Sequence, residues 1–276
     1  MRECLRKLCR LVSCAPMYMS IGEICEIVKS YEKAVKWYRK AAEQGCIEAQ
    51  NKLGLYYRHG QGVEQSHDEA VKWFRKAAEQ GEVHAQYSMG VYYNVGEGVT
   101  KDLAEAVKWY RKAAEQGHAE AQYRLGVRYY NGDGVTKDHN EAVKWFRKAA
   151  EQGYAEAQFH LGWCYYKGEG VTKDIAEAVN WYRKAAEQGF ANAQFNLSNR
   201  YSRGEGVTKD LAEAVKWLRK AAEQGHTKAQ FNLAICYHKG NGVTKDMTEA
   251  VKWYRKAAQQ GHQKAKLVLN DLGETW

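Results

Sequence analysis

Seven tryptophans occupy one position of a pattern that recurs every 36 residues, and they are the first side chains in this sequence that could do chemistry: Trp37, Trp73, Trp109, Trp145, Trp181, Trp217 and Trp253. A ladder of indoles could stack nucleobases or sugars. Each indole, however, lies among the apolar residues of a helical pattern whose other side is charged. Burying one removes roughly 150–250 Å² from water, which stabilises a fold by about 4–6 kcal/mol before entropy is subtracted. We therefore predict that the tryptophans form the core.

A stripe of basic residues accompanies the tryptophans, with Lys36, Arg39 and Lys40 in the first copy. Three positive charges per copy could follow a phosphate backbone. Glu43, however, follows Arg39 by one turn on the same face, where we expect the two to form an i,i+4 ion pair. The net charge of +9 is also spread along the chain rather than clustered. The pattern favours a solvated helix face, with a polyanion or nucleic-acid platform as the alternative.

Histidines and cysteines form no recognisable catalytic or metal-binding set. His118, His226 and His262 share one repeat position directly after a helix-ending glycine, and successive copies would lie too far apart for one metal. We expect a surface position that stabilises a helix C-terminus. The sequence contains no HExxH motif, no CxxC pair and no G-x-S-x-G elbow. It therefore predicts a protein that is not an enzyme and has no cofactor, metal or small-molecule substrate.

Two helices per copy must position these residues. The stretch 106–117 reads AVKWYRKAAEQG, with apolar residues at helical spacing, a D-x-x-E capping box before it and Gly117 at its end. A second helix follows over 119–132, where Ala121, Leu125, Gly126 and Tyr129 form the buried side by spacing. The loop G-x-G-V-x-K-D then leads to the next copy.

The copies combine into one repeat array. Six full units run from about 46 to 260, with a helix over 31–44 before them and a last helix over 265–270. We expect residues 1–29 to be a degenerate capping or weak targeting segment, 30–270 to be the repeat array and 271–276 to be a tail. No apolar run is long enough for a transmembrane span.

The motif AQYRLGVRYYNGDGVTKD, followed by EAVKWFRKAAEQG, resembles the Sel-one-like repeats (SLR), relatives of the tetratricopeptide (TPR) repeat. The resemblance covers about 30–270 and implies an all-α fold, a right-handed α/α superhelical solenoid of 36-residue helix-loop-helix repeats with a concave groove. Family members act as adaptors that bind other proteins. One branch is stapled by paired cysteines in every repeat, and this sequence departs from that branch because its seven cysteines do not follow the period.

Positions that differ between otherwise near-identical copies lie on one face of the helix over 119–132 and its equivalents. The residues immediately before Leu125, two after it and three after it share this face, which lines the concave side in a TPR-like superhelix. Arginine and asparagine there could bind carboxylates or peptide amides, and tryptophan could anchor an apolar side chain. Drift and packing between units are the alternative. The candidate partner-binding residues are Arg124, Arg128, His160, Trp163, Asn196, Asn199, Arg200 and Asn232.

The sequence thus predicts a non-catalytic scaffold or adaptor that binds a partner protein or an extended peptide in its groove. Reduced thiols favour a cytoplasmic location. The basic start and the Leu11–Cys14 box leave export or a lipid anchor as the minor alternative, although Arg10 interrupts the apolar stretch that a signal peptide needs.

Overall fold

The computed structural model describes residues 14–275. The proposed targeting segment falls mainly on residues 1–13, outside that range. The described part of the chain contains fifteen α-helices and no strand, so the predicted all-α fold with two helices per repeat is confirmed. The helices are α2 (Ala15–Ile27), α3 (Tyr31–Glu43), α4 (Ile47–His59), α5 (His67–Glu79), α6 (Val83–Val95), α7 (Leu103–Glu115), α8 (Ala119–Asn131), α9 (His139–Glu151), α10 (Ala155–Lys167), α11 (Ile175–Glu187), α12 (Ala191–Arg203), α13 (Leu211–Glu223), α14 (Thr227–Lys239), α15 (Met247–Gln259) and α16 (Gln263–Asp271).

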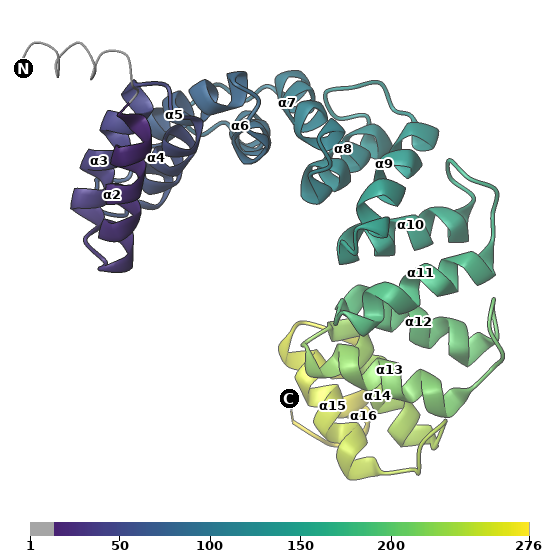
Figure 1. Ribbon diagram of the computed structural model, residues 1–276. Helices are drawn as coiled ribbons and strands as arrows, with labels where there is room; N and C mark the ends of the chain where they lie inside the picture. Colours follow the sequence, from purple (N-terminus) through teal and green to yellow (C-terminus); the bar gives the residue numbers. More distant parts are fainter. Residues whose placement is uncertain (1–13, 276) are drawn as a thin grey trace, which may run out of the picture. The chain divides into compact units, whose positions relative to one another are not determined.

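The chain divides into two compact units, Met1–Lys137 and Asp138–Trp276. The first unit contains α2 to α8 and the second contains α9 to α16. Within each unit, every helix packs against the helix before it and the helix after it (Figure 1). We refer to the even-numbered helices as A helices and to the odd-numbered helices, which carry the seven repeated tryptophans, as B helices.

From α5 onward, the start of each B helix follows the predicted capping box only in part. The Asp102 carboxylate accepts hydrogen bonds from the Ala104 and Glu105 backbone N–H groups at 2.9 and 3.0 Å, as an N-cap should. Glu105 does not return a bond to Asp102, because the Asp102 N–H donates to the Tyr93 carbonyl of the preceding A helix instead. Glu105 is therefore available to Lys108, at 2.8 Å. The cap thus links the B helix to the A helix before it.

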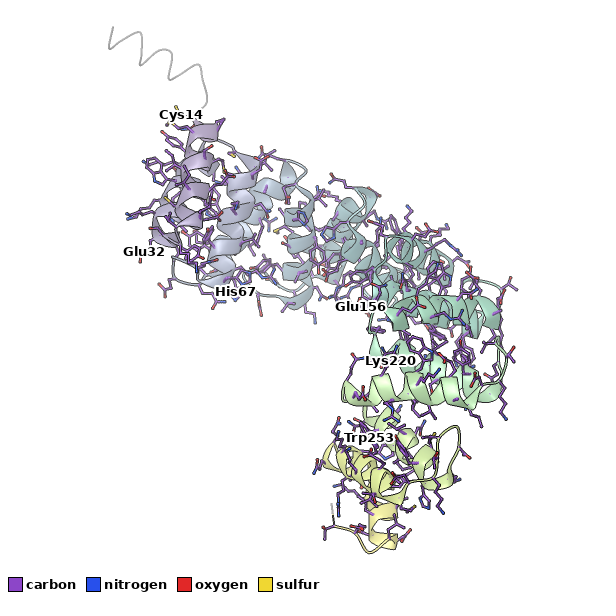
Figure 2. All side chains as sticks on the ribbon, turned by 60° about the horizontal axis from the view of Figure 1, so that its bottom comes forward. Cys14, Glu32, His67, Glu156, Lys220 and Trp253 are labelled. Carbon is purple, nitrogen blue, oxygen red and sulfur yellow. The ribbon has the colours of Figure 1, made fainter. Side chains whose placement is uncertain are left out.

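The tryptophans lie in the core, as predicted. Six of them are only 4–8% exposed, including Trp253, which is labelled in Figure 2, while Trp37 in the first B helix is partly buried. Each indole face is covered by the lysine three residues later, as in Lys112 over Trp109 at 4.0 Å. The lysine ammonium group thus lies over the ring face, where it gains from the negative quadrupole of the indole.

The loop glycines place each linker on the preceding repeat. At Gly134 the backbone has φ +74°, and a Cβ atom there would lie 2.3 Å from the Leu103 carbonyl oxygen. Only glycine combines this left-handed conformation with so close an approach. The loop after an A helix therefore docks on the first turn of the B helix before it, which accounts for the second glycine of the G-x-G motif.

A ladder of buried glutamines joins successive repeats. The Gln194 amide is 3% exposed, and its Nε2 donates to the Ala186 carbonyl at 3.0 Å. Its Oε1 accepts from Gln224 Nε2 at 2.7 Å, one repeat further on. The same arrangement occurs at Gln158 and Gln188. Since a buried amide left unpaired costs about 1–3 kcal/mol, these residues fix how one repeat sits on the next.

The first A helix was not apparent from the repeat spacing. The helix over 31–44 was expected without a preceding partner, whereas α2 packs against it, with Tyr18 and Trp37 at 5.7 Å between ring centroids. Residues 28–30 form a three-residue linker to α3, while the corresponding linker between α4 and α5 spans 60–66. Because this linker is four residues shorter than the later ones, α2 does not follow the 36-residue spacing of the other A helices.

Candidate binding site on the A helices

The two arginines expected to bind acidic groups are held by partners within the chain. Arg128 Nη1 lies 3.3 Å from the Asp133 carboxylate, and its Nη2 donates to the Asn94 Oδ1 atom at 2.6 Å. Arg200 is 6% exposed and forms an ion pair with Glu205. Both acids lie in the loop five residues after their arginine, so each guanidinium group already has an ion-pair partner within the chain. Their proposed role as open carboxylate receptors does not fit this geometry.

The variation between copies is partly matched across repeats. Arg128 of α8 contacts Asn94 of α6, and Lys52 and Tyr56 of α4 both hydrogen-bond the Glu26 carboxylate of α2. Burial acts to raise the pKa of Glu26, yet the bonds from Lys52 and Tyr56 hold it below its usual value. The last turn of one A helix thus carries a side chain that accepts hydrogen bonds from the variable face of the next A helix. Some of the residues that differ between copies therefore pair with a residue of the preceding repeat.

A further pairing of this kind occurs in the second unit. The Arg200 guanidinium lies 4.4 Å from the centroid of the Tyr166 ring, in the preceding A helix. An arginine over a tyrosine face gains from the ring's negative quadrupole. Trp163, in the same A helix as Tyr166, is partly buried, with its ring 6.0 Å from Tyr166 and Lys167 Nζ at 4.9 Å.

The position before the central leucine faces the ring of the B helix, as His160 and Asn196 show. His160 stacks on Phe146 with centroids 5.3 Å apart, and burial lowers its pKa to about 4. Asn196 lies beside the Tyr182 hydroxyl, a close approach without ordinary hydrogen-bond geometry. Arg124, at the same position in α8, is half-exposed and pairs with Glu120 at 3.2 Å.

Asn199 and Asn232 come together at a cavity of about 210 Å³ between α12, α13 and α14. The floor is apolar because Val215, Leu218 and Ile235 line it. Neither asparagine side chain hydrogen-bonds another of the described residues, and both are partly exposed. Both line this one cavity, together with Ser198, Ser202, Leu211, Ala214, Val215, Leu218, Ile235, Cys236 and Asn241.

A larger hollow of about 700 Å³ lies over the first B helix, away from the variable faces. It is lined by Trp37 and by six charged side chains of α3, four basic and two acidic: Lys33, Lys36, Arg39, Lys40, Glu32 and Glu43. All six are exposed, and charges on an exposed helix face contribute little to binding because water screens them. We therefore regard the smaller α12–α14 cavity as the candidate site.

The arginines of the basic stripe donate to tyrosine hydroxyls, and the expected Arg39–Glu43 pairing is wrong because Arg39 donates to Tyr57. Arg75 donates instead to the Tyr93 hydroxyl, 18 residues later, at 2.9 Å, and Arg183 donates to Tyr201 at 3.0 Å. The following A helix brings this tyrosine within reach of the arginine. The arginines are thus held by tyrosines, while the lysines lie over tryptophans or beside glutamates, as in Lys112 and Lys108.

The shared histidine position has a different role from the one expected. His226 is the N-cap of α14, where its Nδ1 accepts the Ala229 N–H at 3.1 Å, and its ring stacks on Phe195 at 4.7 Å. His118 and His262 do the same in α8 and α16. Burial lowers the pKa of all three. These histidines begin an A helix and pack against the repeat before it, rather than stabilising the end of a B helix.

The thiols of the variable faces are protonated at neutral pH. Burial raises the pKa of Cys164 to about 12 and also raises that of Cys236. In the part of the chain that the structure describes, no group of three or more His, Cys, Asp or Glu side chains could hold a metal ion. Within the same range, no helix has both the length and the apolar character that crossing a membrane requires.

Comparison with known families identifies the repeat. The family model of the Sel1 repeat matches residues 17–46, 47–82, 83–118, 119–154, 155–190, 191–226 and 227–262. The chain belongs to the Sel1 repeat family. The first match includes α2, in agreement with its packing against α3. Sel1 repeats form TPR-like, all-helical solenoids that are non-catalytic and generally serve as scaffolds for protein interactions, so the predicted fold class and family are confirmed.

Two solved Sel1-type structures are similar to this chain. A protective antigen present in uropathogenic Escherichia coli strains, which displays an SLR fold, is 40% identical with a TM-score of 0.88 over 94% of this chain. This chain spans only 56% of the antigen. A Sel1 repeat protein from Oxalobacter formigenes is 37% identical with a TM-score of 0.77, over 87% of this chain and 96% of that one. No curated protein matches this chain.

Proposed function

We propose that this Sel1 repeat protein is a non-catalytic scaffold that binds an extended segment of a partner protein on the variable faces of its A helices. In the second unit, the α12–α14 cavity is the anchoring point. The observation that supports the proposal is the pair Asn199 and Asn232, two amides at the rim of an apolar cavity with no hydrogen-bond partner among the described residues. Each amide offers a donor and an acceptor, which suits the backbone of an extended peptide.

The other predicted residues have supporting roles. Trp163 offers a partly exposed apolar surface on the A-helix side of the second unit. Arg200 is held by Glu205 and Tyr166 and shapes the face rather than contacting the partner through its charge. In the first unit, Arg124 is the half-exposed basic group of its variable face. Binding energy is thus expected to come from apolar anchoring and amide bonds more than from ion pairs.

Selection from a displayed library tests this function. Random 12-residue peptides are selected on the full chain, and the recovered peptides are titrated against Asn199→Ala/Asn232→Ala and against Lys216→Ala/Lys252→Ala. The lysines are exposed on B helices of the same unit and serve as the matched control. We expect about a tenfold loss of affinity for the asparagine pair and less than about a twofold change for the lysine pair. If no peptide is recovered, or if both pairs behave alike, the proposal is wrong.

A further inference from the structure

The α12–α14 cavity has a filled counterpart one repeat earlier. There Tyr182 of α11 is 1% exposed, and its ring lies so close to Gly162 that a Cβ atom on the glycine would be 2.9 Å from it. Phe159 contacts the same ring at 5.7 Å between centroids, and Asn196 lies beside the hydroxyl. A tyrosine side chain of the chain itself therefore occupies this space and presents its phenol to an asparagine.

The open repeat has the same asparagine but lacks the ring. One period of 36 residues later, Leu218 stands in place of Tyr182, Ser198 in place of Gly162, and Asn232 in place of Asn196. All three line the cavity. Leu218 is the only non-aromatic residue at its position in seven copies, the others being Tyr38, Phe74, Tyr110, Phe146, Tyr182 and Tyr254. Asn232 thus faces a space from which its phenol partner is missing.

The size and lining of this space fit an incoming aromatic side chain. An apolar cavity of roughly 150 Å³ accommodates benzene, and this one measures about 210 Å³. Leu218 and Ile235 offer apolar walls, while Ser202 and Asn232 supply polar atoms. Asn199 and Ile235 are partly exposed, so the cavity opens to solvent on the A-helix side.

We infer that the cavity binds a tyrosine side chain of the partner segment, with its ring against Leu218 and Ile235 and its hydroxyl at Asn232. This inference rests on the proposed function and names the residue that anchors the partner. Phenylalanine fills the cavity but leaves the Asn232 amide unpaired, and leucine fills it less completely. No lysine or arginine is among the lining residues, so a phosphate on the tyrosine has no cation to pair with there, and phosphorylation weakens binding.

Blocked pentapeptides with tyrosine, phenylalanine, leucine or phosphotyrosine between alanines test the assignment. Binding to the full chain is measured by saturation-transfer NMR and titration, with 4-methylphenol as a free-phenol probe. We expect the tyrosine peptide to bind several-fold more tightly than the phenylalanine peptide and about tenfold more tightly than the leucine peptide. The phosphotyrosine peptide is expected to bind more weakly than the tyrosine peptide. Binding of 4-methylphenol without the tyrosine peptide would mean that the cavity is a small-molecule site, and the inference would be wrong.

Two variants locate the binding. Ser198→Gly/Leu218→Tyr rebuilds the glycine–tyrosine pair of the filled repeat, so it is expected to fold and to lose at least about tenfold in affinity for the tyrosine peptide. Asn232→Ala, at the cavity rim, weakens the tyrosine peptide several-fold and does not weaken the phenylalanine peptide. Circular dichroism checks that both variants keep their helices, and Asn232→Ala alone decides the question if the double variant does not fold.

The outcomes separate this inference from the proposed function. Equal binding of the tyrosine peptide to the wild type and to Asn232→Ala, or no binding to the wild type, overturns the tyrosine assignment. If library peptides still require Asn199 and Asn232, the scaffold function stands without the tyrosine anchor. If no library peptide binds but the tyrosine pentapeptide does, the scaffold proposal fails while the cavity assignment stands.

Discussion

Two adjacent repeats of the second unit, α10–α12 and α12–α14, share nearly all of their packing and differ at the centre. In the first, Tyr182 fills the space between the helices and packs on Gly162. In the second, Leu218 and Ser198 stand at those positions, and a cavity of about 210 Å³ opens. The glutamine bonds between repeats are the same in both, at 2.8 Å for Gln188–Gln158 and 2.7 Å for Gln224–Gln194.

The difference shows how a repeat protein can acquire a binding site without changing how its helix pairs pack. The caps, the tryptophans and the glutamine ladder hold each helix pair in place, so the residues between the pairs can vary. Removing one ring from an otherwise constant frame leaves a cavity, because close-packed neighbours relax only in part. The closed repeat thus serves as a built-in reference for the open one.

The largest expected effect comes from opening the closed repeat. Tyr182→Leu removes a ring that is 1% exposed, and we expect the free energy of unfolding to fall by about 3 kcal/mol, measured by guanidinium denaturation of the full chain. Adding Gly162→Ser to this variant should restore part of the loss and create a second site for the tyrosine peptide. A loss below about 1 kcal/mol would mean that the ring is not what fills the closed repeat.

The glutamine ladder tests whether the two repeats share one frame. Gln158→Ala and Gln194→Ala each remove a buried amide that bonds a carbonyl and a second glutamine, so each should cost about 2 kcal/mol in the same denaturation experiment. A markedly smaller cost for Gln194→Ala would show that the open repeat is already loosened. The exposed Lys216→Ala variant is the control.

His160, in α10, should make the stability of the closed repeat depend on pH in the acid range. Burial holds the pKa of His160 at about 4 against an ordinary 6.5, so the unfolded chain binds more protons than the folded chain between these values. The stabilising effect is fully present above pH 6.5 and is lost as the pH falls toward 4, with about 1–2 kcal/mol lost at pH 5. His160→Asn, which copies the residue of the next two repeats, should flatten this part of the stability–pH curve. A curve of unchanged slope would contradict the assignment to His160.

The smallest effect is expected at the lysines that cover the tryptophans. Lys184 lies 4.0 Å from the Trp181 ring centroid in the closed repeat, and Lys220 lies 4.2 Å from Trp217 in the open one. Both are exposed, and Lys220 is labelled in Figure 2. Lys184→Ala and Lys220→Ala should therefore each change stability by less than about 0.5 kcal/mol. Unequal losses would indicate that the cavity alters the neighbouring B helix.

Much of the fold could be predicted from the sequence because its signals are local and repeated. The helix-capping Asp102 and the buried Trp109 each depend on spacing within one helix, and both were predicted correctly. The first A helix was missed because its linker lacks four residues, which removes it from the 36-residue register. Helical periodicity without register is a weaker signal, although proline in the first turn, as at Pro16 of α2, is typical of a helix N-terminus.

The candidate site was predicted only in outline. Reading the copies against one another identified the variable face and named Asn199 and Asn232, which do line one cavity. The same reasoning misjudged Arg128 and Arg200, whose partners Asn94 and Tyr166 lie 34 residues away in the preceding A helix. The sequence shows that these positions vary, but the pairing depends on how far successive A helices are offset.

The sequence by itself determined the helices, their caps, their buried faces and the order in which they pack, because each depends on interactions within a few residues that recur with every copy. The tertiary structure alone decided which variable side chains satisfy one another and which are left open. Arg200 finds Glu205 and Tyr166, whereas Asn232 faces a cavity because the residue 14 positions before it is a leucine rather than a tyrosine. A free surface is what remains after all contacts between repeats have formed, and no local pattern contains that information.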